Sequence, residues 1–273
     1  IPPVVMRRQK NHKITLMNLI IDAGNTRIKF ALFDSSQMIW HDTVSDWSEE
    51  KINHILDQNP DINKVIISTA REIPKWLTLV FTHRRISFTE MSVQLPMPVT
   101  IGYKTPETLG KDRIAAVVGG RMLFPGKPVL VIDAGTAITY DLVLADGFYP
   151  GGNISPGMRM RFTALHEQTF SLPAVEPSGE VPLIGRDTPE AIRAGVINGL
   201  IYEIDNSINS LRNKYNELEV ILTGGDAGFL SELVKNTIFV SDNLVLMGLN
   251  SILMFENQEI SGSGAVDESS NEK

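Results

Sequence analysis

The chain has 273 residues, enough for one large domain or two of ordinary size. A formal net charge of −7 argues against a general affinity for nucleic acid or anionic membranes, and the absence of cysteine excludes disulfides, thiol catalysis and cysteine–metal sites. The composition, 42% hydrophobic and 21% charged, is that of a soluble globular protein, and no apolar run reaches the roughly 18 residues of a membrane span. We therefore expect a cytoplasmic protein without a membrane partner.

Both ends of the sequence differ from the region between them. Residues 1–16 lack a consistent hydrophobic period, and we expect a tag, an over-extended start or a disordered tail. The end of the chain is rich in Gly, Ser and acids, so we expect disorder over 259–273.

Between these tails the hydrophobic pattern predicts alternating strands and helices. In the first half, 17–124, we expect strands at 19–21, 28–33, 38–43, 65–68 and 86–89, and helices at 47–56, 74–82 and 110–124. In the second half, 125–258, we expect strands at 129–132, 138–144, 148–154, 219–222 and 237–240, and helices at 158–167, 188–211, 227–235 and 244–256. Thr188 is expected to cap the longest helix, with Pro189 at its first position.

The two halves share one order of elements, three strands and then helix, strand, helix, strand and helix, except that the second half has two helices, 158–167 and 188–211, before its fourth strand. Hairpin-linked strands followed by alternating strands and helices favour a mixed sheet with helices on its faces. The sequence therefore predicts an α/β fold of two duplicated halves, with a ligand in a cleft between them at the strand ends.

A polar turn follows the first strand. In DAGNTRIK, 22–29, Asp22 stands where a buried strand ends, Gly24 permits close backbone approach, and Asn25 and Thr26 add donors. Such a turn can hold a phosphate chain while Asp22 holds a hydrated Mg²⁺. An ordinary β-hairpin has the same turn chemistry and is the alternative.

A second copy, IDAGTA at 132–137, favours the ligand-binding interpretation. Asp133 again follows an all-apolar strand, and two carboxylates emerging from buried strands are costly unless cations meet them. A third turn, LTGGD at 222–226, would let a flat ligand such as adenine lie against the backbone, although a tight strand-to-helix turn explains it equally well. No G-x-G-x-x-G follows a strand, and the P-loop-like segment 120–128 has the wrong spacing and a proline in place of Ser or Thr.

Six segments together carry a family resemblance. They are DAGNTRIK (22–29), GKDR (110–113), IDAGTA (132–137), GGNISPG (151–157), DTPEAI (187–192) and LTGGD (222–226). In this order and spacing they resemble the type III pantothenate kinases, members of the actin-like and sugar-kinase superfamily built from two ribonuclease-H-like halves. The resemblance runs from about residue 17 to residue 256.

The resemblance implies a homodimeric enzyme that phosphorylates pantothenate with ATP to give 4'-phosphopantothenate, the first step of coenzyme A biosynthesis. The residues that it implies for ATP are Asp22, Ala23, Gly24, Asn25, Thr26, Arg27, Ile28, Lys29 and Thr136. The residues that it implies for pantothenate, near the subunit interface, are Tyr103, Gly110, Lys111, Asp112, Arg113 and Thr188. Asp112 matches the proton acceptor and Asp133 the ligand of a monovalent cation, K⁺ or NH₄⁺. Lys111 stands where small residues are frequent in the family.

The chemistry of the residues agrees with this assignment. Asp112, at the start of a helix, can accept a proton from an alcohol that attacks a phosphate, although a first-turn acid can also merely stabilise its helix. Arg113 can pair either with a substrate carboxylate or with a structural acid. A regulatory protein of the same fold and a kinase for another small alcohol are the alternative functions.

Overall fold

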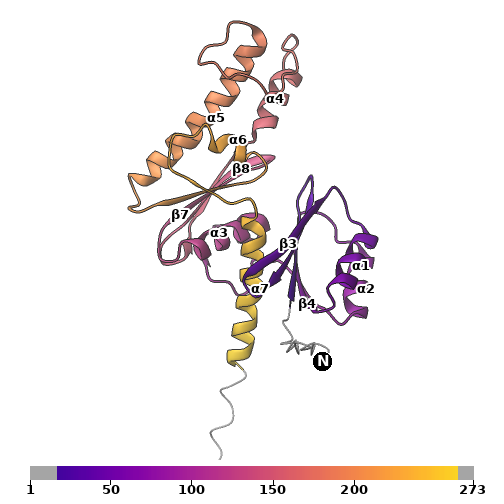
Figure 1. Cartoon of the computed structure of the whole chain (residues 1–273). Coiled ribbons are helices and arrows are strands. Elements are labelled where there is room, and N and C mark those ends of the chain that lie inside the picture. Colours follow the sequence, from indigo (N-terminus) through magenta and orange to yellow (C-terminus); the bar gives the residue numbers. More distant parts are fainter. Residues whose placement is uncertain (1–16, 264–273) are drawn as a thin grey trace, which may run out of the picture. The chain divides into compact units, whose positions relative to one another are not determined.

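The computed structural model describes residues 17–263. The predicted N-terminal tail and residues 264–273 lie outside the described part of the chain. The chain divides into two compact units, Ile1–Glu90 and Met91–Lys273 (Figure 1). Each unit is built around its own five-stranded sheet.

The first unit has two helices on one face of its sheet (Figure 1). Its elements are β1 (Met17–Ala23), β2 (Ile28–Asp34), β3 (Gln37–Val44), α1 (Glu49–Gln58), β4 (Ile62–Thr69), α2 (Lys75–His83) and β5 (Ser87–Glu90). The strands lie in the order β3-β2-β1-β4-β5. The strand β2 is antiparallel to both of its neighbours, β1 and β3, whereas β4 and β5 run parallel to β1. Leu19 and Ile21 of β1 pack in one buried cluster with Ile52 of α1 and Leu77 of α2. Burial of this shared apolar surface holds both helices on the sheet.

The second unit repeats this plan and adds elements to it. Its strands are β6 (Thr100–Ile101), β7 (Val129–Ala134), β8 (Ala137–Val143), β9 (Phe148–Tyr149), β10 (Gly151–Pro156), β11 (Glu219–Thr223) and β12 (Phe239–Val240). Its helices are a 3₁₀ turn (Pro106–Thr108), α3 (Lys111–Leu123), α4 (Met158–Glu167), α5 (Thr188–Arg212), α6 (Ala227–Ser231) and α7 (Leu244–Ser263). The main sheet has the order β10-β8-β7-β11-β12, which is the order of the first unit, and β6 pairs with β9 apart from it. The predicted duplication of an α/β plan is confirmed.

Helices cover both faces of the second sheet, which explains its uninterrupted apolar strands. Leu130 and Ile132 of β7 belong to a buried cluster with residues of α4, α5 and α6. On the opposite face, a Cβ on Gly120 of α3 would lie 2.9 Å from Val131 of the same strand. Figure 1 shows α5 on the face opposite α3 and α7.

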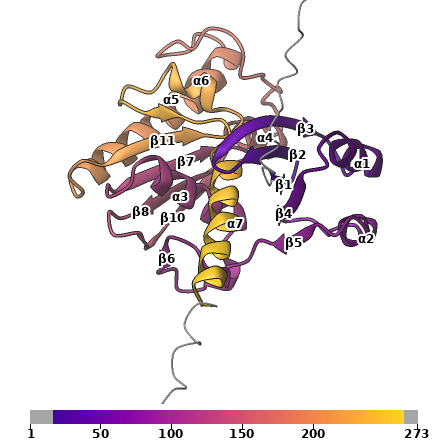
Figure 2. The same ribbon diagram turned by 60° about the horizontal axis from the view of Figure 1, so that its bottom comes forward.

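Helix α3 packs closely against α7 within the second unit, and the two helices lie side by side in Figures 1 and 2. A Cβ on Gly248 of α7 would lie 1.8 Å from the carbonyl oxygen of Ala115, and one on Gly119 would lie 2.6 Å from that of Leu244. The glycines thus allow the two backbones to touch. The sequence repeat suggested halves meeting at 124/125, whereas this packing unites α3 with the second compact unit, which begins at Met91.

Several element boundaries differ from the predictions. The strand expected at 148–154 is two strands, because the backbone turns at Gly151, whose φ is 128°. The side chain of Asp187 caps α5 by accepting from the Glu190 N–H at 2.8 Å, and the predicted cap Thr188 is already helical. Helix α6 ends at Ser231, before the predicted residue 235, and α7 continues to Ser263, into the predicted tail. The two-residue strand β6 was not predicted, since two residues carry no periodicity.

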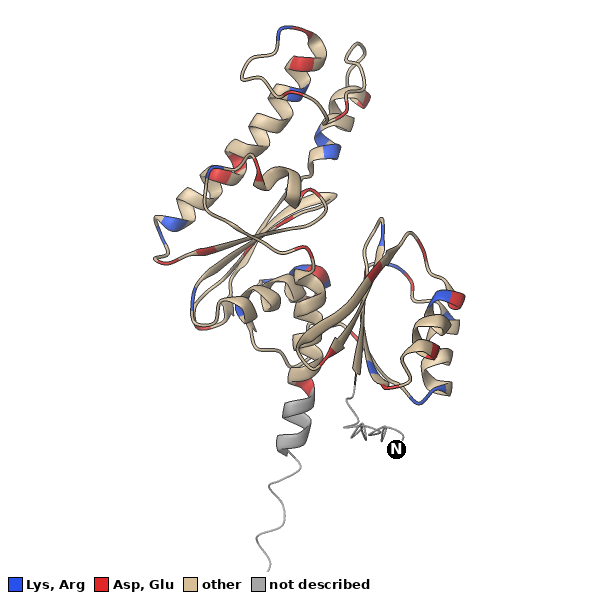
Figure 3. Ribbon diagram, viewed as in Figure 1, with Lys and Arg blue, Asp and Glu red and all other residues tan. Residues whose placement is uncertain are grey.

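In the described part of the chain, basic and acidic residues are interspersed along both units (Figure 3). A bound anion would therefore depend on local donors more than on a broad field. Over residues 17–263, no helix is both long and apolar enough to cross a membrane.

Candidate active site

The first predicted phosphate loop connects β1 to β2. Asp22 of β1 lies opposite Lys29 of β2 in the strand register. Asn25, Thr26 and Arg27 are exposed at the tip of this hairpin. Arg71, which follows β4, fixes this tip by donating from Nη2 to the Asn25 carbonyl oxygen at 2.6 Å. The loop therefore presents polar side chains from a fixed backbone. Nothing in the sequence around Arg71 indicated this role.

The second predicted loop connects β7 to β8 and is held on two sides by other turns. The Gly157 N–H donates to the Thr136 carbonyl oxygen at 3.2 Å, and the Asp226 N–H donates to that of Ala134 at 3.0 Å. A Cβ on Gly157 would lie 2.2 Å from the Thr136 oxygen. The motif glycines at 157 and 224 thus serve close approach to this loop.

Asp226 is the charged residue of the LTGGD turn. Burial raises the pKa of its carboxyl, and the positive charge of Arg159 opposes that rise without cancelling it. A half-buried acid beside the Asp133 loop is the kind of group that a bound cation would stabilise. Asp226 was not among the residues singled out from the sequence.

The third predicted segment forms the first turn of α3. Asp112 is exposed, and its Oδ1 accepts a hydrogen bond from the Arg113 backbone N–H at 2.9 Å. A Cβ on Gly110 would lie 2.5 Å from that oxygen, so glycine leaves room for the carboxylate. Asp112 is thus a solvent-accessible acid in the first turn of a helix.

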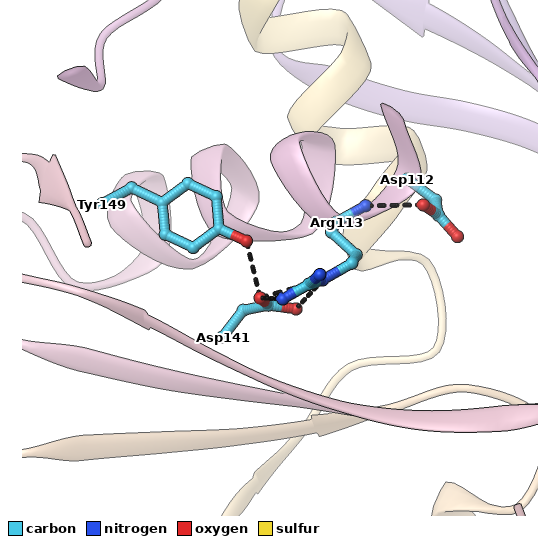
Figure 4. Close-up of polar contacts among 4 residues, drawn as sticks. All are labelled: Asp112, Arg113, Asp141 and Tyr149. Atoms are coloured by element: carbon cyan, nitrogen blue, oxygen red, sulfur yellow. Dashed lines mark hydrogen bonds and ion pairs between the residues drawn. The ribbon is translucent and has the colours of Figure 1, made fainter. Parts of the chain in front are cut away.

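Arg113 points away from solvent and pairs with a buried acid (Figure 4). Its Nε lies 3.0 and 3.1 Å from Oδ1 and Oδ2 of Asp141, and its Nη2 lies 2.5 Å from Oδ1. Burial lowers the pKa of Arg113, but the hydrogen bonds and charge of Asp141 outweigh it and raise the pKa overall. Arg113 thus has Asp141 as a structural partner, and a contact with a substrate carboxylate stays a prediction.

Tyr103 lies beside Arg113. The Arg113 Cζ is 5.7 Å from the centroid of the Tyr103 ring, a cation–π distance. The Tyr103 ring also lies 3.0 Å from where a Cβ on Gly151 would stand. Tyr103 therefore lies beside the turn that carries Gly110, Asp112 and Arg113, and their binding of pantothenate stays a prediction.

Thr188 lies elsewhere in the second unit. It is exposed at the start of α5, where it lines a groove of about 1020 Å³ with residues of α4 such as Arg161 and Leu165. The helices whose residues line this groove, α4 and α5, lie on the face of the sheet opposite α3 (Figure 1). Thr188 stands at the start of α5 and Asp112 in the first turn of α3, and these two helices lie on opposite faces of the sheet (Figure 1).

Asp141 and Tyr149 belong to the site region and were missed from the sequence. Asp141 is fully buried within the strand ITYDLVL, and a charge in an apolar strand was the signal that could have revealed it. Tyr149 gave no such signal, because a buried tyrosine is common in a core.

No group of three or more His, Cys, Asp or Glu side chains within residues 17–263 is arranged to hold a metal ion. The donor sets of Asp22 and Asp133 still fit the cations expected there. Mg²⁺ keeps several waters and is commonly bound by one or two carboxylates together with substrate phosphates.

Known proteins resemble the chain over most of its length. The family model for type III pantothenate kinase matches residues 18–210. A type III pantothenate kinase of Phocaeicola vulgatus is 45% identical over 242 residues, covering 89% of this chain and 100% of the relative. One of Christiangramia forsetii is 41% identical over 245 residues, with coverage of 89% and 100%.

Two solved structures show the same fold at low sequence identity. A conserved putative Baf family transcriptional activator from Campylobacter jejuni has a TM-score of 0.53 and 21% identity, covering 88% of this chain and 99% of its own. A putative N-acetylmannosamine kinase from Listeria monocytogenes has a TM-score of 0.51 and 12% identity, with coverage of 89% and 99%. These likenesses concern the fold alone. The sequence match is what assigns the family, and the chain belongs to the type III pantothenate kinases.

Proposed function

We propose that the chain transfers the γ-phosphate of ATP to the primary hydroxyl of pantothenate, giving 4'-phosphopantothenate and ADP. The observation that carries the proposal is the first turn of α3, where an exposed Asp112 carboxylate stands beside a buried, paired Arg113. This turn lies within the region that matches the family.

In the reaction, the pantothenate hydroxyl oxygen forms a bond to the γ-phosphorus as the bond to the β,γ-bridging oxygen breaks. The hydroxyl proton passes to Asp112, and ADP leaves with the bridging oxygen. Phosphoryl transfer depends mainly on positioning and on stabilisation of charge, so one oriented carboxylate is sufficient as the base.

ATP is assigned to the two hairpin loops. Residues 22–29 would hold its phosphates through the exposed donors at the tip and through Lys29, and Thr136 would contact the nucleotide from the second loop. Asp22 would hold Mg²⁺ through water, and Asp133 would bind K⁺ or NH₄⁺. The support is chemical: each carboxylate stands one residue before the end of an otherwise apolar strand, and a cation would offset the cost of partly burying it.

Pantothenate is assigned to Tyr103, Gly110, Lys111, Asp112, Arg113 and Thr188. In this arrangement the Nε–Nη2 edge of Arg113 is taken by Asp141, so only its Nη1 side could serve the substrate. The location of Thr188 on the other face of the sheet supports a homodimer in which a second copy of the chain supplies that residue.

Turnover of pantothenate by the purified protein tests the proposal. The protein would be incubated with Mg–ATP and pantothenate in KCl, NH₄Cl or NaCl, and the product identified by mass spectrometry. We expect 4'-phosphopantothenate and ADP in equal amounts, with K⁺ or NH₄⁺ required. ATP binding without turnover would favour a regulatory protein, and turnover of a different small alcohol would correct the substrate.

A further inference from the structure

We propose that Asp141 and Tyr149 are positioning residues for phosphate transfer: through Arg113 they fix the pantothenate hydroxyl's proton acceptor, Asp112, and the ring of Tyr103. The inference rests on the proposed function, which supplies the roles of Asp112 and Tyr103. Neither Asp141 nor Tyr149 contacts the reacting atoms in this scheme. They act on the geometry of residues that do.

The side chains of Arg113, Asp141 and Tyr149 form one buried cluster (Figure 4). Asp141 and Tyr149 are both fully buried, and Arg113 is 6% exposed. The Nε of Arg113 donates to both carboxylate oxygens of Asp141, and the Tyr149 hydroxyl donates to Oδ1 at 2.6 Å. The carboxylate thus receives donors from two elements, α3 and β9, while standing on a third, β8.

The proton donors of this cluster, Arg113 and Tyr149, keep their protons at neutral pH. Burial first, and then the charge of Asp141, raises the pKa of Tyr149, so its hydroxyl remains a donor. The pKa of Arg113 is raised by Asp141 in spite of burial, so the guanidinium remains charged. A buried charge pair with both partners satisfied has one low-energy arrangement, which is what a positioning device requires.

Arg113 connects the buried cluster to the two site residues Asp112 and Tyr103. It follows Asp112 on the first turn of α3, and its own backbone N–H donates to the Asp112 carboxylate. Its guanidinium also lies at a cation–π distance from Tyr103. A shift of the guanidinium would therefore move the helix turn that carries the base and one wall of the substrate position.

The glycines of the GGNISPG segment support the same conclusion. Gly152 pairs with Asp141 across β8 and β10, and a Cβ there would lie 2.5 Å from Oδ1 of Asp141 and 2.0 Å from the Tyr140 carbonyl oxygen. Gly151, beside it, faces the Tyr103 ring. Gly152 thus makes room for Asp141 and Gly151 for Tyr103, which accounts for the first two glycines of the motif.

Tyr149→Phe tests the inference, because it removes only the hydroxyl that holds Asp141. We expect kcat/KM for pantothenate to fall about tenfold, a loss equivalent to one hydrogen bond to a charged group. The dissociation constant of ADP, measured by calorimetry, should stay within about twofold of wild type, because an effect of these residues on the acceptor site leaves nucleotide binding intact.

Tyr140→Phe is the matched control. Tyr140 is 5% exposed, and its hydroxyl donates to the Glu203 carboxylate at 2.9 Å, so the chemical change is the same. Its side chain belongs to the cluster on the α5 face, away from α3. We expect a similar loss of thermal stability in this variant, with kcat/KM for pantothenate within about twofold of wild type. Equal kinetic losses in both variants would overturn the inference.

A double-mutant cycle adds a second readout. Asp141→Asn should lower kcat/KM for pantothenate at least as much as Tyr149→Phe, and the double variant should lose little more than Asp141→Asn, because the hydroxyl acts only through that carboxylate. Additive losses would contradict the inference, and if Asp141→Asn does not fold, Tyr149→Phe and its control decide alone. An inactive wild type would refute the proposed function, whereas an active wild type with an unaffected Tyr149→Phe variant would refute the positioning role.

Discussion

A Cβ on Gly224 would lie 2.4 Å from Oδ1 of Asp133 and 2.5 Å from the Ala134 carbonyl oxygen. Gly224 also has a φ of 98°, in the left-handed region that favours glycine. The glycine turn after β11 therefore fits directly against Asp133, the acid one residue before the end of β7. The two strands are parallel neighbours, with Thr223 opposite Asp133, which brings the two turns to one edge of the sheet.

Gly224→Ala is expected to displace Asp133 and to strain the backbone, at a cost of about 1–3 kcal/mol in the free energy of unfolding. We expect a lower Tm and a raised KM for ATP or for the activating cation. Gly225→Ala is the control, because nothing lies within 4 Å of a Cβ at Gly225. Similar stability and kinetics in both variants would show that the contact with Asp133 is unimportant.

Asp112→Asn is expected to lower kcat by at least about a hundredfold, the usual contribution of a general base. The substitution keeps the shape of the side chain, and ADP binding measured by calorimetry should survive. Glu107→Gln neutralises an exposed acid in the 3₁₀ turn just before α3 and should leave kcat unchanged. Near-normal kcat in Asp112→Asn would remove this residue from the mechanism.

Asp133→Ala is expected to abolish or weaken activation by K⁺ or NH₄⁺, because it removes the carboxylate assigned to the cation. The measurement is the initial rate against cation concentration at saturating Mg–ATP. Asp22→Ala should instead change the dependence on Mg²⁺. An unchanged K⁺ dependence in Asp133→Ala would move the cation site elsewhere, and Asp226, whose pKa burial raises, would be the next residue to test.

Much of the fold could be predicted because its signals are local. The hairpins β1–β2 and β7–β8 follow from apolar runs separated by polar turns, and α4 was predicted at its observed bounds, Met158–Glu167. The cap of α5 was wrong by one residue, since Asp187 and Thr188 can both accept from a helical N–H and only geometry decides between them.

The long-range contacts that build the site could not be predicted from local sequence patterns. Arg113 and Asp141 are 28 positions apart, and the sequence named only the first of them. The packing of α3 on α7 depends on Gly119 and Gly248, which no period distinguishes from other helix glycines. The site residues implied by resemblance stay predictions, because their roles depend on ligands.

Thr188 gives a test of the proposed dimer. Thr188→Ala is expected to raise KM for pantothenate, and Asp112→Asn to lose kcat. If the site joins residues from two copies, subunit exchange between these variants creates heterodimers with one intact site. Random mixing would then give roughly a quarter of wild-type activity, because half the dimers are mixed and each has one good site of two.

The assay is the rate at sub-saturating pantothenate before and after the variants are unfolded and refolded together, with each variant refolded alone as the control. Light scattering would establish that the protein is dimeric. No gain of activity on mixing would argue that each site is built from a single chain. A fully active Thr188→Ala would remove Thr188 from the substrate site.

Glu203 of α5 is the centre of a hydrogen-bond network on the face of the sheet opposite α3. It accepts hydrogen bonds from Arg161 at 2.6 Å and from Tyr140 at 2.9 Å, and Arg161 also donates to Ser155 at 2.9 Å. Burial raises the pKa of Glu203, but the hydrogen bonds and the charge of Arg161 outweigh it, so the pKa is lowered overall. The network ties α4, α5 and the end of β10 together.

Because the folded pKa of Glu203 lies below its unfolded value, the ionised carboxylate stabilises the fold above the unfolded pKa. That contribution is lost as the pH falls through the folded pKa. Glu203→Gln is therefore expected to cost about 1–2 kcal/mol at pH 7, or a few degrees in Tm, and the difference from wild type should shrink as the pH falls below about 4. The measurement is Tm against pH for both proteins. Glu232→Gln, at an exposed position after α6, should follow the wild-type curve throughout. A difference in Tm that stays constant from pH 7 to the acid limit would show that Glu203 contributes through packing and not through its charge.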